Sequence, residues 1–115
     1  MEAVLVGLAH NREHYRIAYP SSLRPRLYVL GHPFEVLDLS ERGLRFRLGE
    51  AVPPQPGNEL RGELRFHQGE SLPVVGTIVR VADGNAGVSL DERVPLRVIM
   101  AEQRRLLDRQ RRGSP

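Results

Sequence analysis

Six short segments with the pattern of β-strands follow one another between residues 25 and 91, and turn-forming residues separate them. In LRFRL (44–48), apolar residues alternate with arginines, which is the period of a strand buried on one face. The prolines of AVPPQPGN (51–58) cannot donate to a strand ladder, so this segment is predicted to be a loop. The predicted strands are RLYVL (26–30), FEVLDL (34–39), LRFRL (44–48), ELRGELRFH (59–67), LPVVGTIVRVA (72–82) and AGVSL (86–90). Short strands at this spacing predict a small antiparallel β-barrel or β-sandwich.

After these strands the apolar residues change to a helical period. Pro95 suits the first turn of a helix, and a helix is predicted over residues 95–112. Its apolar stripe consists of Leu96, Ile99, Met100, Leu106 and Leu107. The arginines outside the stripe are Arg104, Arg105, Arg109, Arg111 and Arg112. They are interpreted either as a solvated face, favoured near a helix C-terminus, or as a basic surface for nucleic acid or a membrane.

A chain of 115 residues is long enough for one domain with a single hydrophobic core. No apolar run approaches the roughly 20 residues that span a bilayer, and the opening MEAVLVGLAH lacks the features of a signal peptide. A cytoplasmic location is therefore expected. The absence of cysteine excludes disulfides and thiolate catalysis. The net charge of +3, with arginine as every one of the 17 basic residues, favours anionic partners.

The sequence contains no pattern typical of an active site. Its histidines are scattered, and none is spaced from another histidine or from a carboxylate as metal ligands are. They are His10, His14, His32 and His67. A glycine-rich phosphate loop, a nucleophile motif and a carboxylate cluster are also absent from the sequence. We therefore expect a binding protein without catalytic activity, bound metal or cofactor.

The segment DLSERG (38–43) has an unusual local design. Asp38 and Ser40 are two residues apart at the end of a predicted strand, so their side chains share a face. Gly43 is expected to close the turn with a positive φ. In one interpretation, Asp38 and Ser40 only hydrogen-bond the amides of the turn. In the other, the carboxylate accepts hydrogen bonds from the Watson–Crick edge of guanine, and the hydroxyl serves a phosphate or a second donor.

Two arginines, Arg12 and Arg16, stand four positions apart in NREHYR (11–16). Four residues return a side chain to the same face of a helix or of a strand, so the pair could hold an anion. However, chance alone predicts about two to three such arginine pairs in a chain of this composition. The same spacing occurs at Arg61/Arg65, Arg93/Arg97 and Arg105/Arg109. Taken alone, Arg12 and Arg16 are interpreted as ordinary solvated charges.

The two motifs together resemble the PilZ domain family, in which RxxxR precedes the first strand and DxSxxG lies between the second and third. The resemblance covers roughly residues 11 to 105 and includes GTIVR (76–80), the GV that follows and the terminal helix. It implies a mainly β fold, a six-stranded antiparallel split β-barrel with a C-terminal α-helix. The single PilZ-like domain would span 1–115, divided into an N-terminal arm (1–24), the barrel (25–91) and the helix (95–112).

The resemblance also implies a function, since PilZ domains are bacterial receptors for cyclic di-GMP that act by changing the activity of a partner protein. In the family, the arginine pair binds phosphate oxygens and guanine O6/N7 edges. Asp38 and Ser40 match the positions that hold a guanine from its Watson–Crick side. Gly43 matches the glycine that lets the turn approach, and Arg80 matches a position that often packs against a base. The ligand-binding residues implied in this chain are Arg12, Arg16, Asp38, Ser40, Gly43 and Arg80.

Two departures from the family pattern bear on these expectations. Asn11 stands where many members carry another basic residue, so it stays open whether one or two ligand molecules bind. Leu90 replaces a common aromatic residue and is expected to fill a core position.

Two alternatives to a cyclic di-GMP receptor stay open. One is a PilZ-like interaction module of motility or pilus machinery that does not bind nucleotide. The other, less favoured, is a small basic barrel that binds nucleic acid. Such barrels usually present aromatic stacking platforms, whereas only 5% of this chain is aromatic. Its three phenylalanines, Phe34, Phe46 and Phe66, are expected to face the core.

The segment that carries the arginine pair is expected to lie outside the strand pattern, because YPSSLRP (19–25) disfavours regular structure. We expect residues 8 to 20 to be mobile in the free protein. The phosphates of the ligand would then draw both arginines onto the barrel near Asp38 and Ser40, and this ordering would expose a new face to a partner.

Overall fold

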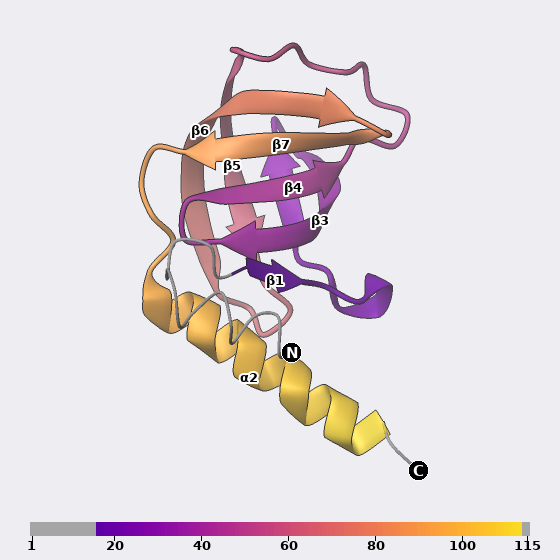
Figure 1. Ribbon diagram of the computed structural model, residues 1–115, viewed down its shortest axis with the longest axis vertical. Helices are drawn as coiled ribbons and strands as arrows, with labels where there is room; N and C mark the ends of the chain where they lie inside the picture. Colours follow the sequence, from indigo (N-terminus) through magenta and orange to yellow (C-terminus); the bar gives the residue numbers. More distant parts are fainter. Residues whose placement is uncertain (1–15, 114–115) are drawn as a thin grey trace.

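The computed structural model describes residues 16–113, with side chains described as far as residue 109. All six predicted strands and the predicted helix are present, and their ends differ from the expected ones by a few residues (Figure 1). In chain order the elements are β1 (Arg16–Ala18), a 3₁₀ helix η2 (Ser21–Leu23), β2 (Arg26–Val29), β3 (His32–Ser40), β4 (Gly43–Arg47), β5 (Glu59–Arg65), β6 (Ser71–Ala82), β7 (Asn85–Leu90) and α2 (Leu96–Gly113).

The strands form one antiparallel sheet in the order β1-β3-β2-β5-β6-β7-β4, and β4 pairs back with β3. Strands β2 to β7 therefore close a six-stranded antiparallel barrel, as expected, and closure leaves few free strand edges. The apolar residues that alternate along each strand fill its interior. Among the most buried are Leu27, Leu39, Leu44, Leu64 and Ile78.

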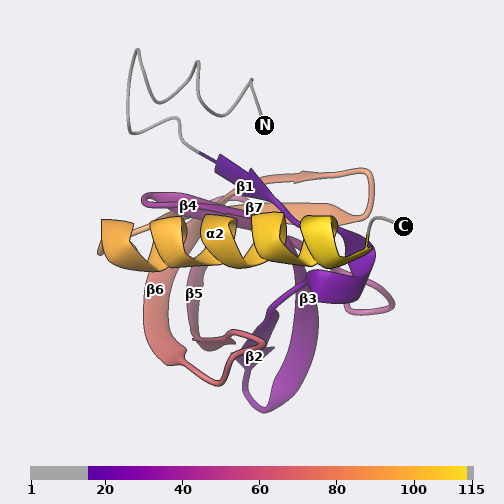
Figure 2. The ribbon, with the colours of Figure 1, turned by 90° about the horizontal axis from the view of Figure 1, so that it is seen from below.

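The helix α2 covers one end of the barrel, which is clearest in the view from below in Figure 2. Its residues Val98 and Ile99 are buried in the same core as the strands. Leu90 is also a core residue, as expected, and Phe46 and Phe66 are buried. Phe34 is partly buried and packs edge-on against Phe46, so the three phenylalanines belong to the core rather than to a surface platform.

The expectation that Arg16 lies outside the strand pattern is wrong. Arg16 begins β1, which pairs with the second half of β3 in the register Arg16↔Ser40, Ile17↔Leu39 and Ala18↔Asp38. β2 pairs with the first half of β3, and η2 is the excursion between the two short strands. Residues 16–20 are therefore anchored to the barrel. Residues 8–15 of the expected mobile segment lie outside the described residues.

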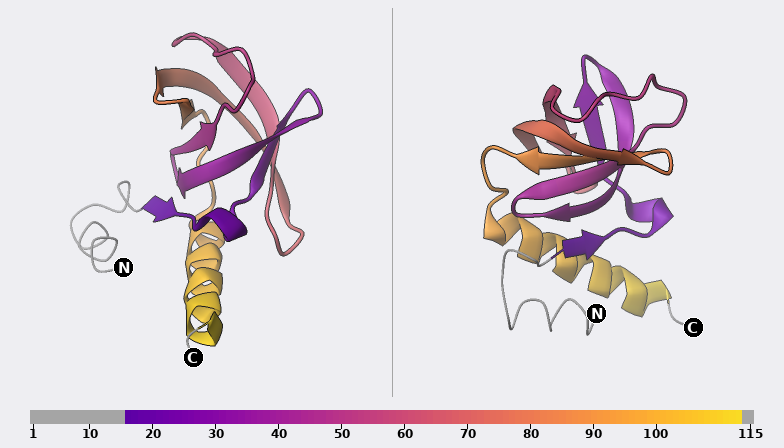
Figure 3. Two further views of the ribbon diagram at one scale, coloured as in Figure 1. Left: turned by 90° about the vertical axis from the view of Figure 1, so that its right-hand side faces the viewer. Right: turned by 45° about the horizontal axis from the view of Figure 1, so that its top comes forward.

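A buried polar contact joins β1 to the helix. Tyr19 directly follows β1, and its hydroxyl donates a hydrogen bond of 2.7 Å to Oε1 of Glu102 in α2. Arg105 donates two more hydrogen bonds to the same carboxylate, at 2.9 and 3.0 Å. Glu102 has no exposed surface, so these donors replace the water that a carboxylate would otherwise need. Figure 3 shows the result, with β1 lying between the barrel and α2.

Candidate functional site

The candidate site lies on the outer face of the sheet, and a β-bulge in β3 positions its acidic residue. In the pairing of β3 with β4, Val36 is opposite Phe46, but the register shifts before Asp38, which is opposite Arg45. An extra residue in one strand reverses which face the following side chains take. Asp38 consequently shares the outer face with Arg45 instead of following Val36 into the core.

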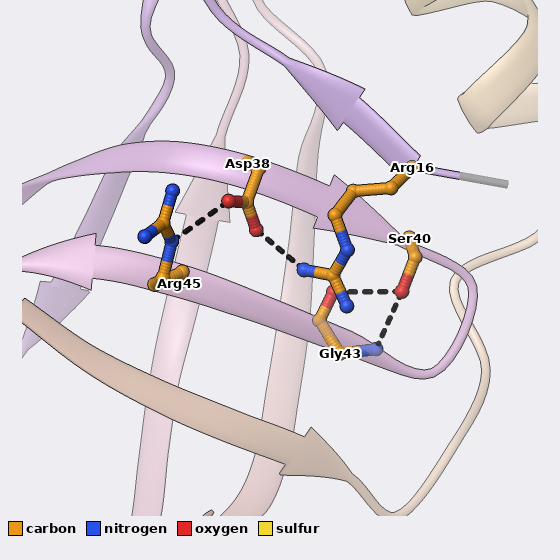
Figure 4. Close-up of polar contacts among 5 residues, drawn as sticks. All are labelled: Arg16, Asp38, Ser40, Gly43 and Arg45. Carbon is orange, nitrogen blue, oxygen red and sulfur yellow. Dashed lines mark hydrogen bonds and ion pairs between the residues drawn. The ribbon is translucent and has the colours of Figure 1, made fainter. Parts of the chain in front are cut away.

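The carboxylate of Asp38 is nearly buried and lies between two arginines from neighbouring strands (Figure 4). Its Oδ1 accepts a hydrogen bond from Nη1 of Arg16 at 2.5 Å, and its Oδ2 accepts one from Nε of Arg45 at 2.8 Å. The side chain of Asp38 is 6% exposed, whereas those of Arg16 and Arg45 are 51% and 52% exposed. The acceptor is therefore fixed in place, and its two partners have room to reorient.

Ser40 takes part in the turn itself. Its Oγ accepts a hydrogen bond from the amide of Gly43 at 3.1 Å and lies 3.3 Å from the carbonyl oxygen of Gly43, to which the hydroxyl can donate. Of the two interpretations drawn from the sequence, the turn interpretation thus describes the contacts of Ser40. It does not describe Asp38, whose two oxygens face arginines.

Gly43 is required for a different reason from the expected one. It is not among the glycines with positive φ. A Cβ at this position would lie 2.8 Å from the carbonyl oxygen of Val88 in β7, which is closer than real Cβ atoms come. The glycine therefore permits the close approach of β4 to β7, and the expectation of a left-handed turn residue is wrong.

Arg80 lies on the same face as Asp38 but on β6, beyond β4 and β7. It borders a hollow of about 140 Å³ that is also lined by Arg45, Ala82, Asp83, Asn85 and Gly87. Arg80 and Arg45 are both opposite Gly87, one from each side, so the three positions form a row across the sheet. Arg80 is exposed and has no hydrogen bond or ion pair to any other described residue.

The structure therefore brings Arg16, Asp38, Ser40 and Gly43 together, and Arg80 lies two strands from Gly43. Arg12 lies outside the described residues. Arg45 was not identified from the sequence as a site residue, although the hairpin pattern indicates its position beside Asp38. A hairpin with Glu41 and Arg42 at its tip places Leu39 opposite Leu44 and Asp38 opposite Arg45, and this is the register observed.

Other features of the described part carry less chemical information. A larger hollow of about 510 Å³, at the end of the barrel away from α2, is mainly apolar and contains none of the motif residues. Leu30 and Val52 border it and are almost fully exposed. Residues 16–113 contain no cluster of histidine and carboxylate side chains arranged to hold a metal ion. Within the same range, no helix is both long and apolar enough to cross a membrane.

The comparison that decides the family is the match of the PilZ domain model to residues 10–110. The chain belongs to the PilZ domain family. The match spans both motifs, the barrel and most of α2. No curated protein matches the chain.

Two solved structures resemble this PilZ domain. The uncharacterized Legionella protein Lpg0364 has a TM-score of 0.59 and 14% sequence identity, and the match covers 85% of this chain and 99% of that chain. The inhibitor of motility MotI/DgrA of Bacillus subtilis also has a TM-score of 0.59 and 14% identity, with 87% of this chain and 51% of that chain covered. At this identity the two structures support the fold, and this chain matches about half of the motility inhibitor.

Proposed function

We propose that this PilZ domain is a receptor for cyclic di-GMP that regulates a partner protein and has no catalytic activity, metal or cofactor of its own. The observation that carries the proposal is the environment of Asp38, whose nearly buried carboxylate is held in place on the outer face of the barrel. The N1–H and N2–H groups of guanine can donate to such a carboxylate, and hydrogen bonds to a charged group are among the strong ones.

The exposure of Arg16 supports an exchange of partners when the ligand arrives. Its guanidinium is half exposed, and β1 fixes its backbone beside Ser40. Arg16 can turn from Asp38 toward a phosphate, for which the planar guanidinium fork is well suited. Asp38 would then be free to accept the guanine edge. Arg12, four residues earlier in the motif, would supply the second cation.

Titration calorimetry of the purified protein with cyclic di-GMP tests the proposal. We expect saturable binding of cyclic di-GMP and much weaker binding of GTP, cyclic di-AMP and a short RNA, because only cyclic di-GMP holds two guanines and two phosphates close together in one small ring. Asp38→Asn should abolish most of the affinity. Glu35→Gln is the matched control, since Glu35 is an ion-paired carboxylate of the same strand that contacts Arg24 and Arg47 instead. No binding of cyclic di-GMP by the unmodified protein would overturn the proposal.

A second candidate is a PilZ-like interaction module that does not bind nucleotide, with motility machinery as the class of partner. Two observations favour it. The motif groups of Asp38 and Ser40 already have partners within the protein, and Leu30 and Val52 expose apolar surface beside the larger hollow. Failure of cyclic di-GMP binding by a fully folded protein would support this candidate, and saturable binding that Asp38→Asn removes would reject it.

A further inference from the structure

Arg45 borders both Asp38 and the hollow beside Arg80. Its Nε donates to Asp38, and Figure 4 marks no contact from its two terminal nitrogens. One guanidinium can therefore hold Asp38 through one edge and offer its remaining N–H donors and its planar face to a second group.

The hollow on the far side of Arg45 has the chemistry of a site for a planar base. Arg45 on β4 and Arg80 on β6 are both opposite Gly87, so their backbones lie about 10 Å apart, two strand spacings. Gly87 places no side chain on the floor between them. Guanidinium planes stack well on nucleobases, and the Asn85 amide and the Asp83 carboxylate can meet the polar edge of a base. The charge of Asp83 disfavours a phosphate in the same place.

We propose that Arg45 is a ligand-binding residue that positions Asp38 for one guanine and forms a wall of the hollow that receives the other base of the dinucleotide. This inference rests on the proposed function and extends it to Arg45 and Gly87. Asp38 lies on β3 and the floor of the hollow on β7, so the two bases bind on opposite sides of Arg45, which lies on β4 between them.

Arg47 provides a matched control for the test. It is the next outward arginine on β4, its side chain is 59% exposed, and it lies 3.9 Å from Glu35 instead of contacting Asp38. Arg45→Ala should weaken binding of cyclic di-GMP by about ten- to a hundredfold, as loss of a charge-assisted contact does. Arg47→Ala should change it by less than about threefold, because it removes the same charge from a residue that neither contacts Asp38 nor lines the hollow. Arg45→Lys keeps the charge but not the planar fork and should restore only part of the affinity.

Gly87→Ala tests the hollow separately. A Cβ at Gly87 would meet its nearest neighbour, Cβ of Arg80, at 3.8 Å, which is ordinary contact, so the fold should accept the methyl group. The methyl group would raise the floor under the base and weaken binding several-fold without lowering the melting temperature. The preference for cyclic di-GMP over cyclic GMP–AMP, which keeps one guanine, should shrink in Arg45→Ala and in Gly87→Ala but not in Arg47→Ala.

Two results separate this inference from the proposed function. If the unmodified protein does not bind cyclic di-GMP, both are overturned. If it binds, but Arg45→Ala behaves like Arg47→Ala or the preference between the two dinucleotides is unchanged, only the assignment of Arg45 and the hollow is overturned. Circular dichroism and melting curves of each variant establish that the folded protein is being compared.

Discussion

At the scale of single residues, the motif DxSxxG contains two kinds of residue that the sequence pattern does not distinguish. Ser40 and Gly43 build the hairpin, through hydrogen bonds to the turn and through the close approach of β4 to β7. The side chain of Asp38 is instead held by arginines of other strands. Substitutions at different positions of DxSxxG should therefore change the stability of the fold by different amounts.

Ser40→Ala should destabilise the fold, whereas substitution of a residue that contacts only the ligand would leave the stability unchanged. The substitution removes the acceptor for the amide of Gly43 at a position that is 2% exposed, and leaving a buried amide unsatisfied costs about 1–3 kcal/mol. Urea unfolding measures the loss. Ser89→Ala is the control, because Ser89 is exposed on the neighbouring strand β7, opposite Gly43. Its effect should stay within about 0.5 kcal/mol. Equal stability of the two variants would contradict the structural role of Ser40.

Gly43→Ala and Gly87→Ala should differ sharply in stability, although both glycines lie on the outer face of neighbouring strands. At Gly43 the added Cβ meets a backbone oxygen at 2.8 Å, so the strands must move apart, and such overpacking typically costs about 1–3 kcal/mol. At Gly87 the contacts are ordinary, and replacing glycine in a strand by alanine reduces the entropy of the unfolded chain. Thermal melting of both variants measures the difference. A stable Gly43→Ala protein would mean that β4 and β7 can separate at little cost.

At the scale of elements, the contact of Tyr19, Glu102 and Arg105 joins the strand that carries Arg16 to the helix that ends the domain. Burial, and then the charge of Glu102, raise the pKa of Tyr19 far above its ordinary value of 10.0. The folded protein therefore keeps the Tyr19 proton where the unfolded chain loses it. This contribution to stability is complete below pH 10 and decreases as the pH rises above it.

Tyr19→Phe should change both the stability and its dependence on pH. At pH 7 the variant should lose about 1–3 kcal/mol, because the buried carboxylate of Glu102 loses a donor. Above pH 10 the unmodified protein should lose up to about 1.4 kcal/mol per pH unit from Tyr19, a slope that the variant lacks. Urea unfolding between pH 9 and pH 11 compares the two proteins. Parallel stability curves over this range would show that Tyr19 is not buried against Glu102.

At the scale of the whole molecule, the site and the helix are connected over a short stretch of chain. Arg16 begins β1 and contacts the site, and Tyr19 directly follows β1 and contacts α2. A ligand that draws Arg16 away from Asp38 therefore acts on the strand that Tyr19 connects to Glu102 in α2. This gives the proposed receptor a physical route from the ligand to a surface that a partner could recognise.

Amide hydrogen exchange should detect this connection. In the unmodified protein, cyclic di-GMP should change the exchange of β1 and of the turn of α2 around Glu102, because a buried contact joins them. In Tyr19→Phe, the ligand should still change exchange in β1, while the response in α2 should be reduced. An unchanged response of α2 in the variant would show that the signal does not pass through Tyr19.

The elements with a local signal could be predicted from the pattern of residues alone. Alternation along 44–48, the turn residues between strands and the apolar period after Pro95 predicted the six barrel strands and the helix, and the two motifs together indicated the family. The pairing of Asp38 with Arg45 could also be predicted from the sequence, because the register of the hairpin depends only on which two residues form its tip.

Features that depend on residues far apart in the chain could be identified only from the folded barrel. The three residues of β1 have no local partner, and they form a strand because the second half of β3, 20 to 24 residues later, offers a free edge. The bulge in β3 places the side chain of Asp38 on the outer face. The nearby carbonyl oxygen of Val88 explains why residue 43 is a glycine. Likewise, Tyr19 meets Glu102 across 83 residues. Such contacts depend on how the barrel closes, and a local pattern of residues does not determine that closure.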